Sequence, residues 1–213
     1  MIKLALLKIM SWKYPMKYKH LNFKVHFIEK EFYAILKSKT EVATSYKTFG
    51  SYNDLDNSYD IFFSIGGDGT ILRSVTFIRD LNIPVLGINT GRLGFLATIQ
   101  KNEIREVIEL ILIKEYNIQE RTLLSVKTSP KTEDLSDINF ALNEVTVARK
   151  NTTSMIGVKT YLDEEYLTHY WADGLIISTP TGSTGYSLSC NGPVVLPNSN
   201  SIVITPIAPH NMN

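Results

Sequence analysis

Cysteine and net charge are both scarce in this sequence of 213 residues. Cys190 is its single cysteine, so no disulfide can form within the sequence, which fits a reducing compartment. The formal net charge is +1, so no overall field draws the chain to nucleic acid or to an anionic membrane. Any binding of phosphate must therefore come from local groups.

Long apolar runs and metal-ligand patterns are also missing. No run approaches the roughly 20 apolar residues needed to cross a bilayer. The opening MIKLALLKIM is interrupted by Lys3 and Lys8, which favours a first β-strand over a signal peptide. The four histidines lack metal-ligand spacing, and with one cysteine this argues against a zinc site. We therefore expect a cytoplasmic protein with neither nucleic-acid nor membrane partners.

The sequence does contain enough apolar residues for a core, and its first half has α/β periodicity. Hydrophobic residues make up 44% of the chain and charged residues 20%. Residues 61–65 predict a strand, 71–81 a helix and 83–88 a second strand, which together make a βαβ unit with parallel strands. Helices are also expected at 29–37 and 102–116, the latter with a buried stripe of Ile104, Val107, Ile108 and Ile111.

The second half changes character. Short alternating runs separated by polar turns predict antiparallel β-structure at 123–127, 140–149 and 155–162. The predicted fold is an α/β N-terminal domain with a parallel sheet (1–118), followed by a β-rich, antiparallel, sandwich-like second domain (119–213). A strand-like run at 201–207 lies close to the last residue, so we expect the second domain to lack its C-terminal strands and tail.

The first candidate site is the turn Gly66–Gly67–Asp68–Gly69–Thr70. Its glycines permit positive φ angles and close approach of a ligand. Thr70 is the expected N-cap of a helix whose free N–H groups favour a phosphate. A carboxylate beside an anion site makes sense if it binds a metal or takes a hydroxyl proton, so Asp68 is a candidate general base in phosphoryl transfer. The alternative is a structural turn in which Asp68 merely caps the helix.

The second candidate site is the segment 173–189, where an apolar strand runs into a turn dense in hydroxyls and glycines. Such a loop can satisfy the polar edges of a small heterocycle while Tyr186 stacks on its face. The alternative is a Ser/Thr-rich turn in which Tyr186 packs in the ordinary way.

The third candidate is Asn143–Glu144. Phe140 and Leu142 are expected to point inward, as are Val145 and Val147, so the alternation slips between the two pairs and predicts a β-bulge. Asparagine can read a donor–acceptor pair on a base, and glutamate can accept from ribose hydroxyls. The alternative is a solvated strand edge.

A fourth segment, 89–96, follows the strand at 83–88, and open α/β sheets bind ligands at the carboxyl ends of their strands. Arg73 and Arg92 are the nearest cations for a phosphate. For each of them the alternative is an ordinary surface arginine.

Together these residues resemble the NAD kinase family over 61–100 and 140–211. The Gly-Gly-Asp-Gly-Thr turn is shared with phosphofructokinases and with lipid kinases of the diacylglycerol and sphingosine type. Asn143–Glu144 and the segment 173–189 are much more specific to NAD kinases. Trp171 is a departure, because many relatives carry arginine at this place.

The resemblance implies an enzyme that transfers a phosphoryl group from ATP or polyphosphate to the 2′-hydroxyl of the adenosine ribose of NAD, giving NADP. Asp68 would be the general base, a divalent ion such as magnesium would be needed, and the protein would be a homodimer or homotetramer. The implied substrate-binding residues are Asp68, Gly69, Arg73, Asn143, Glu144, Asp173, Thr184, Gly185, Tyr186, Ser187, Leu188 and Ser189. Two alternatives are a lipid kinase of the same superfamily and an NAD(H)-binding module without catalytic activity.

Overall fold

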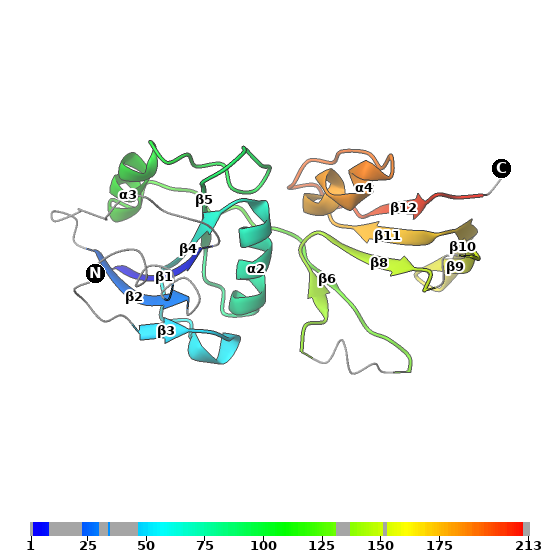
Figure 1. Cartoon of the computed structure of the whole chain (residues 1–213), viewed down its shortest axis with the longest axis horizontal. Coiled ribbons are helices and arrows are strands. Elements are labelled where there is room, and N and C mark those ends of the chain that lie inside the picture. Colours follow the sequence, from blue (N-terminus) through cyan, green and yellow to red (C-terminus); the bar gives the residue numbers. More distant parts are fainter. Residues whose placement is uncertain are drawn as a thin grey trace. The chain divides into compact units, whose positions relative to one another are not determined.

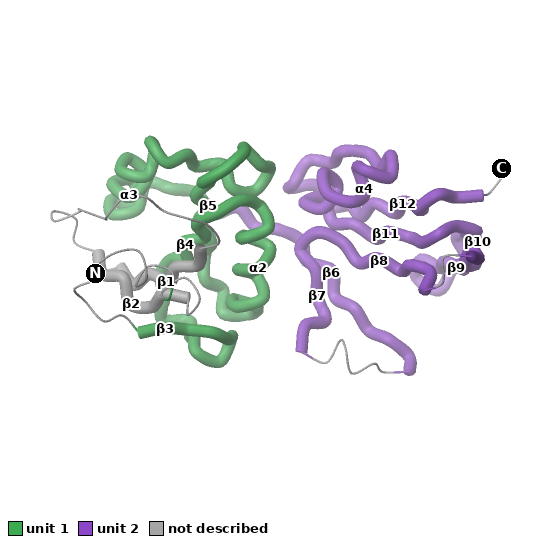
Figure 2. The backbone as a smooth tube through the Cα atoms, in the orientation of Figure 1, with its two compact units in different colours: residues 1–118 green, residues 119–213 purple. Residues whose placement is uncertain are grey.

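The computed structural model describes residues 2–8, 23–29, 34, 47–130, 137–150 and 153–210. The chain divides into two compact units, a first unit of Met1–Ile118 and a second unit of Gln119–Asn213 (Figure 2). No helix within the described ranges has the length and apolar character needed to span a membrane.

The first unit is built on a five-stranded sheet in which every neighbouring pair is parallel (Figure 1). The strand order is β3-β2-β1-β4-β5, so the order reverses between β1 and β4. Open α/β sheets bind ligands beyond the carboxyl ends of the strands at such a reversal. The strands are β1 (Ile2–Lys8), β2 (Phe23–Glu29), β3 (Lys47–Phe49), β4 (Ile61–Gly66) and β5 (Val85–Asn89).

Alternate side chains of β4 build two separate cores on the two faces of this sheet. Three isoleucines of helix α3 (Ile104–Leu112) pack against one face, together with Ile61, Phe63 and Ile65. Phe62 points to the other face, where it packs with helix α2 (Asp68–Ile78) and with the residues around the short 3₁₀ helix η1 (Tyr52–Asp54). The predicted strand–helix–strand unit and the stripe of α3 are confirmed.

The start of α2 differs from the prediction. The helix begins at Asp68 with Gly67 as its N-cap, so the expectation that Thr70 caps it is wrong. Thr70 is instead the third helical residue, and its buried side chain packs directly against Gly66. The expected positive φ angles are also absent, because no glycine in the described ranges has one. These glycines are therefore needed because a side chain would not fit or would fill the space beside them, and not because of their backbone conformation.

The helix expected over 29–37 starts on a residue that belongs to β2, because Glu29 is the last residue of that strand. Apart from Ala34, the rest of this segment lies outside the described residues.

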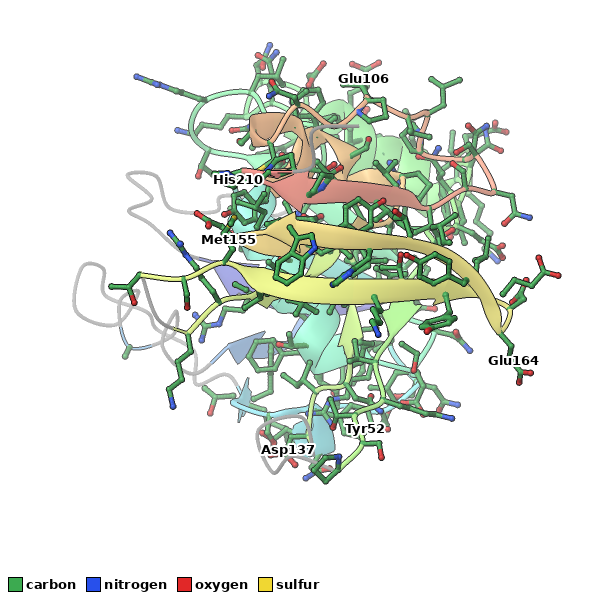
Figure 3. The ribbon with its side chains drawn as sticks, turned by 90° about the vertical axis from the view of Figure 1, so that its right-hand side faces the viewer. Tyr52, Glu106, Asp137, Met155, Glu164 and His210 are labelled. Carbon is green, nitrogen blue, oxygen red and sulfur yellow. The ribbon has the colours of Figure 1, made fainter. Side chains whose placement is uncertain are left out.

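The second unit consists of antiparallel strand pairs, which confirms the predicted fold class. A three-stranded sheet has the order β12-β11-β8, and a separate hairpin pairs β9 with β10. Figure 3 faces this hairpin, with Met155 at its open end and Glu164 in its turn. The strands are β6 (Leu124–Ser125), β7 (Phe140–Ala141), β8 (Glu144–Ala148), β9 (Ile156–Leu162), β10 (Glu165–Ala172), β11 (Gly174–Ser178) and β12 (Val203–Ile207).

The predicted bulge around Asn143 is wrong. The chain leaves β7 at Ala141 and enters β8 at Glu144, and these strands belong to different sheets. The slip in alternation therefore marks a change of sheet, and Val147 is 45% exposed rather than inward-facing. After β11 the chain forms a 3₁₀ helix, η3 (Thr181–Thr184), and one turn of α-helix, α4 (Tyr186–Ser189).

Phe62 should be a principal support of the first unit, because it is fully buried and its ring lies edge-on to Phe49 with centroids 5.7 Å apart. We expect Phe62→Ala to lower the free energy of unfolding of this unit by about 3–5 kcal/mol. Ile113→Ala is the control, since Ile113 is 67% exposed and its truncation should change stability by less than about 0.5 kcal/mol. Chemical denaturation of both variants checks this, and equal effects would contradict it.

Candidate functional site

The Asp68 carboxylate is held by the backbone of the loop that follows β5. Its Oδ2 accepts the N–H of Phe95 at 2.7 Å, and its Oδ1 accepts those of Leu96 at 2.9 Å and Ala97 at 3.0 Å. Asp68 is the first residue of α2, yet its carboxylate bonds to this loop rather than to its own helix. Asp68 therefore does not cap its helix. Its side chain instead connects two segments of the first unit.

Asn89, the last residue of β5, holds the same loop from inside. It is only 5% exposed, and its amide nitrogen donates to the carbonyls of Arg92 at 2.9 Å and Ala97 at 3.1 Å. Its amide oxygen accepts the N–H of Gly91 at 2.8 Å. Two side chains, Asn89 and Asp68, therefore fix the loop 90–97.

Glycines at this site provide two kinds of space. A Cβ placed on Gly94 would lie 2.5 Å from both Cγ and Oδ2 of Asp68 and closer still to Oδ1, which real Cβ atoms do not do. A Cβ placed on Gly67 or Gly69 would meet nothing within 4 Å. The loop is closed against the carboxylate at Gly94, while the turn itself leaves room beside its backbone for a ligand.

The two candidate cations lie on different elements of the first unit. Arg73 is on α2, with its guanidinium 5.7 Å from the centre of the Phe77 ring. Arg92 is exposed in the loop, where its carbonyl accepts the Asn89 amide. Contact of either side chain with phosphate stays a prediction.

In the second unit, Asn143 and Glu144 lie against the start of α4. The Glu144 carboxylate accepts the backbone N–H of Tyr186. A Cβ on Gly185 would lie 3.2 Å from Glu144 Oε2 and 3.4 Å from Asn143 Nδ2, so all three residues meet at one place. The structure therefore brings together Asn143, Glu144, Gly185 and Tyr186 from two distant parts of the sequence.

This cluster holds two buried acceptors that lack donors. Asn143 Oδ1 and Glu144 Oε2 have no hydrogen-bond partner among the described residues. Burial raises the pKa of the Glu144 carboxyl above its ordinary value of 4.5, and the N–H of Tyr186 acts in the opposite direction. Buried polar atoms are nearly always paired in folded proteins, so two neighbouring orphans fit a ligand that donates two hydrogen bonds.

The hydroxyl groups of the segment 173–189 mostly bond within the protein. Thr179 Oγ1 donates to the Leu142 carbonyl at 2.6 Å, and Ser183 Oγ donates to the Pro180 carbonyl at 2.7 Å. Ser187 Oγ lies 2.8 Å from Thr205 Oγ1 and is fully buried. These three hydroxyls therefore shape the turn, and contact of the segment with a heterocycle stays a prediction.

The remaining residues predicted here lie nearer the surface. Tyr186 is 46% exposed and Leu188 is 42% exposed, and Ser189 is also exposed. Thr184 is half-buried, and its hydroxyl donates to the Thr181 carbonyl at 3.3 Å. The surface of α4 is therefore open to a ligand at Tyr186.

Asp173 lies apart from this cluster. It precedes β11, whereas the turn with Tyr186 follows it, and five residues of extended strand span about 17 Å. Its carboxylate pairs with Arg149 at 2.8 Å, and the backbone N–H of Arg149 donates to the Asp173 carbonyl at 2.9 Å. Contact of Asp173 with the nicotinamide end stays a prediction. Trp171 nearby is 50% exposed, with its ring 4.9 Å from that of His169.

Three residues that were not predicted individually shape the two parts of the site, although Gly94 and Gly182 lie within the predicted segments 89–96 and 173–189. Gly94 admits the Asp68 carboxylate, and Gly182 admits the backbone of Asn143, which a Cβ would overlap. Arg121 donates to Thr181 Oγ1 at 3.5 Å, and burial lowers the pKa of its guanidinium. From the sequence, Gly94 and Gly182 could be identified only as loop glycines, because the residue that a glycine contacts cannot be predicted from its neighbours in the sequence.

A metal ion does not fit these residues as a resident group. Within the described ranges, no three His, Cys, Asp or Glu side chains are arranged to hold one. The Asp68 carboxylate is also largely occupied by the three backbone N–H groups of the loop.

The sequence matches two domains of one family. Residues 16–116 match the ATP-NAD kinase N-terminal domain, and residues 142–213 match the ATP-NAD kinase C-terminal domain. The chain belongs to the NAD kinase family. Among family members, an NAD kinase of Christiangramia forsetii is 58% identical over 186 residues, and one of Bacteroides fragilis is 43% identical over 184 residues. The matches cover 87% and 86% of this chain, but only 63% and 62% of these two relatives.

Solved structures of the NAD kinase family have the same fold. Yeast NADH kinase, solved in complex with NADH, has a TM-score of 0.79 at 26% identity, over 100% of this chain and 67% of that one. An NAD kinase from Archaeoglobus fulgidus, solved in complex with ATP, has a TM-score of 0.66 at 24% identity, over 100% of this chain and 74% of that one. The second likeness concerns the fold alone.

The raised pKa of Glu144 predicts a pH dependence of stability. The folded protein holds this proton more tightly than the unfolded chain does, so ionisation of Glu144 lowers stability as the pH rises from below 4.5 through its folded-state pKa. Glu144→Gln removes this loss. The variant should gain stability relative to the wild type across that window and keep a constant difference above it.

Denaturation curves at a series of pH values measure this difference. Glu165→Gln, an exposed glutamate of the same unit, is the matched control and should follow the wild-type curve. A Glu144→Gln curve parallel to the wild type throughout would contradict the prediction.

Proposed function

We propose that this protein transfers a phosphoryl group from ATP or polyphosphate to the 2′-hydroxyl of the adenosine ribose of NAD, giving NADP. The observation that carries the proposal is the match to both ATP-NAD kinase domains, which extends over the residues of both clusters. The 58% identity to an enzyme named NAD kinase supports it.

In this proposal the second unit recognises NAD. The two unpaired acceptors, Asn143 Oδ1 and Glu144 Oε2, would accept hydrogen bonds from the dinucleotide's hydroxyl or amide donors. Tyr186 is exposed beside them and would stack on the adenine ring. The neighbouring backbone and Ser189 would complete the pocket, and Asp173 would reach the nicotinamide end.

Asp68 would carry the chemistry, with Gly69 and Arg73 beside it. Its carboxylate takes the proton of the 2′-hydroxyl as that oxygen attacks the terminal phosphorus of the donor. A bond forms between the ribose oxygen and phosphorus, and the bond from phosphorus to the bridging oxygen of the donor breaks. The remaining donor, ADP in the case of ATP, leaves with that bond's electron pair.

A divalent ion, such as magnesium, would arrive on the phosphates of the donor. The proposal is supported by the side chains, because no group of three His, Cys, Asp or Glu among the described residues is suited to hold the ion by itself. Magnesium is commonly bound through substrate phosphates and water in this way. The ion would neutralise charge on the donor.

The proposal extends to setting and assembly. A single cysteine suits the reducing cytoplasm. The family resemblance supports a homodimer or homotetramer.

The test of function is direct. Purified protein with magnesium, NAD and either ATP or polyphosphate should form NADP, detected with an NADP-specific dehydrogenase. The same mixture with a diacylglycerol in place of NAD should form no phosphatidate. Binding of NAD without any NADP would favour a binding module and refute the kinase.

Tyr186→Ala tests the adenine pocket. Loss of the stacking partner should weaken NAD binding by about 1–2 kcal/mol, which is roughly 5- to 30-fold in Kd. Tyr161→Ala is the matched control, because Tyr161 is 59% exposed on β9 and outside the cluster. Isothermal titration calorimetry measures both, and an unchanged Kd for Tyr186→Ala would exclude the stacking role.

A further inference from the structure

The hydrogen bonds of Asp68 distinguish its two carboxylate oxygens. Each oxygen has two lone-pair directions. Oδ1 uses both of them, for the N–H groups of Leu96 and Ala97. Among the described residues, Oδ2 receives only the N–H of Phe95. One acceptor position is therefore left on the carboxylate, and it belongs to Oδ2.

This arrangement depends on the absence of a side chain at Gly94. The three donors follow Gly94 directly in the chain, and a Cβ at this position would overlap all three atoms of the carboxylate. A larger residue would therefore separate the loop from Asp68 or turn the carboxylate away. The φ angle of Gly94 is not positive, so overlap is the reason for glycine and backbone conformation is not.

We propose that Gly94 is a positioning residue for Asp68. By carrying no side chain, it lets the N–H groups of Phe95, Leu96 and Ala97 hold the carboxylate so that one lone pair, on Oδ2, accepts the substrate proton. The second half of this statement rests on the proposed kinase function, whereas the contact between loop and carboxylate does not.

These hydrogen bonds also affect how the variant Asp68→Asn is interpreted. An amide replaces one oxygen with an NH₂ donor, which in either orientation faces a backbone N–H of the loop. Asp68→Asn thus loses loop contacts as well as the base. It does not preserve the shape of the site, so its loss of activity alone cannot identify the base.

Gly94→Ala is the informative variant, and Gly91→Ala is its matched control. Gly91 lies in the same loop, and a Cβ there would meet nothing within 4 Å. We expect Gly94→Ala to lower Tm by about 5 °C or more and to speed amide hydrogen exchange at Leu96 and Ala97. Gly91→Ala should leave both measurements within error of the wild type.

A double-mutant cycle with Asp68→Ala tests the link between the two residues. Asp68→Ala removes the carboxylate, so Gly94→Ala should cost far less Tm in that background than in the wild type. Equal Tm losses in the two backgrounds would overturn the proposal. So would unchanged amide exchange at Leu96 and Ala97 in Gly94→Ala.

Turnover distinguishes positioning from stability alone. Gly94→Ala should reduce kcat about 100-fold, because a displacement of about 1 Å at a reacting group has an effect of this size. The Kd for NAD should stay within about threefold, since Gly94→Ala leaves Asn143, Glu144 and Tyr186, which are proposed to hold the dinucleotide, unchanged. Phe62→Ala is the destabilised control and should keep kcat near the wild-type value when folded.

A Gly94→Ala variant with wild-type kcat would refute the positioning role in an active enzyme. If the wild type makes no NADP, the proposed function fails. The Tm cycle and the amide exchange then still decide whether Gly94 positions the carboxylate.

Discussion

The contact between the Asp68 carboxylate and the backbone of the loop after β5 organises the first unit's candidate site. It joins the start of α2 to the end of β5, two points that the parallel sheet places side by side. Without it, the backbone N–H groups of Phe95, Leu96 and Ala97 would lose their acceptor. The carboxylate supplies the compensating acceptors and acquires a fixed orientation in return.

The second unit uses the opposite arrangement. The buried hydroxyls of its turn are paired within the protein, as with Ser183 on the Pro180 carbonyl and Thr179 on the Leu142 carbonyl. Asn143 and Glu144, which come directly after Leu142 in the sequence, each keep a buried oxygen that has no hydrogen-bond partner among the described residues. One unit therefore arranges backbone N–H groups around the Asp68 carboxylate, and the other keeps two buried acceptors without donors among the described residues. Such preorganisation removes much of the ordering cost of binding.

Sequence periodicity predicted the parts of this structure that depend on repeated local burial. The alternation in β4 and the isoleucine stripe of α3 follow from one-sided packing, which short windows record. Thr70 misled because a threonine near a helix start usually caps it, whereas here its side chain packs on Gly66. The contact between Gly94 and Asp68 escaped prediction because it depends on how β4 and β5 pair. The roles of the Thr179 and Ser187 hydroxyls were missed for the same reason, since their partners, Leu142 and Thr205, lie far away in the sequence.

The glycines of this fold differ from most loop glycines in the substitutions that they tolerate. A glycine with positive φ can often be replaced by asparagine or aspartate, which tolerate that backbone conformation. Within the described ranges no glycine is of that kind, and Gly66, Gly94 and Gly182 are each pressed against other atoms. At such positions the polarity, charge and propensity of a substitute are irrelevant, because every side chain begins with the same Cβ. Relatives that keep these contacts should therefore retain glycine at these three positions, whereas the residue at the position of Gly91 can vary.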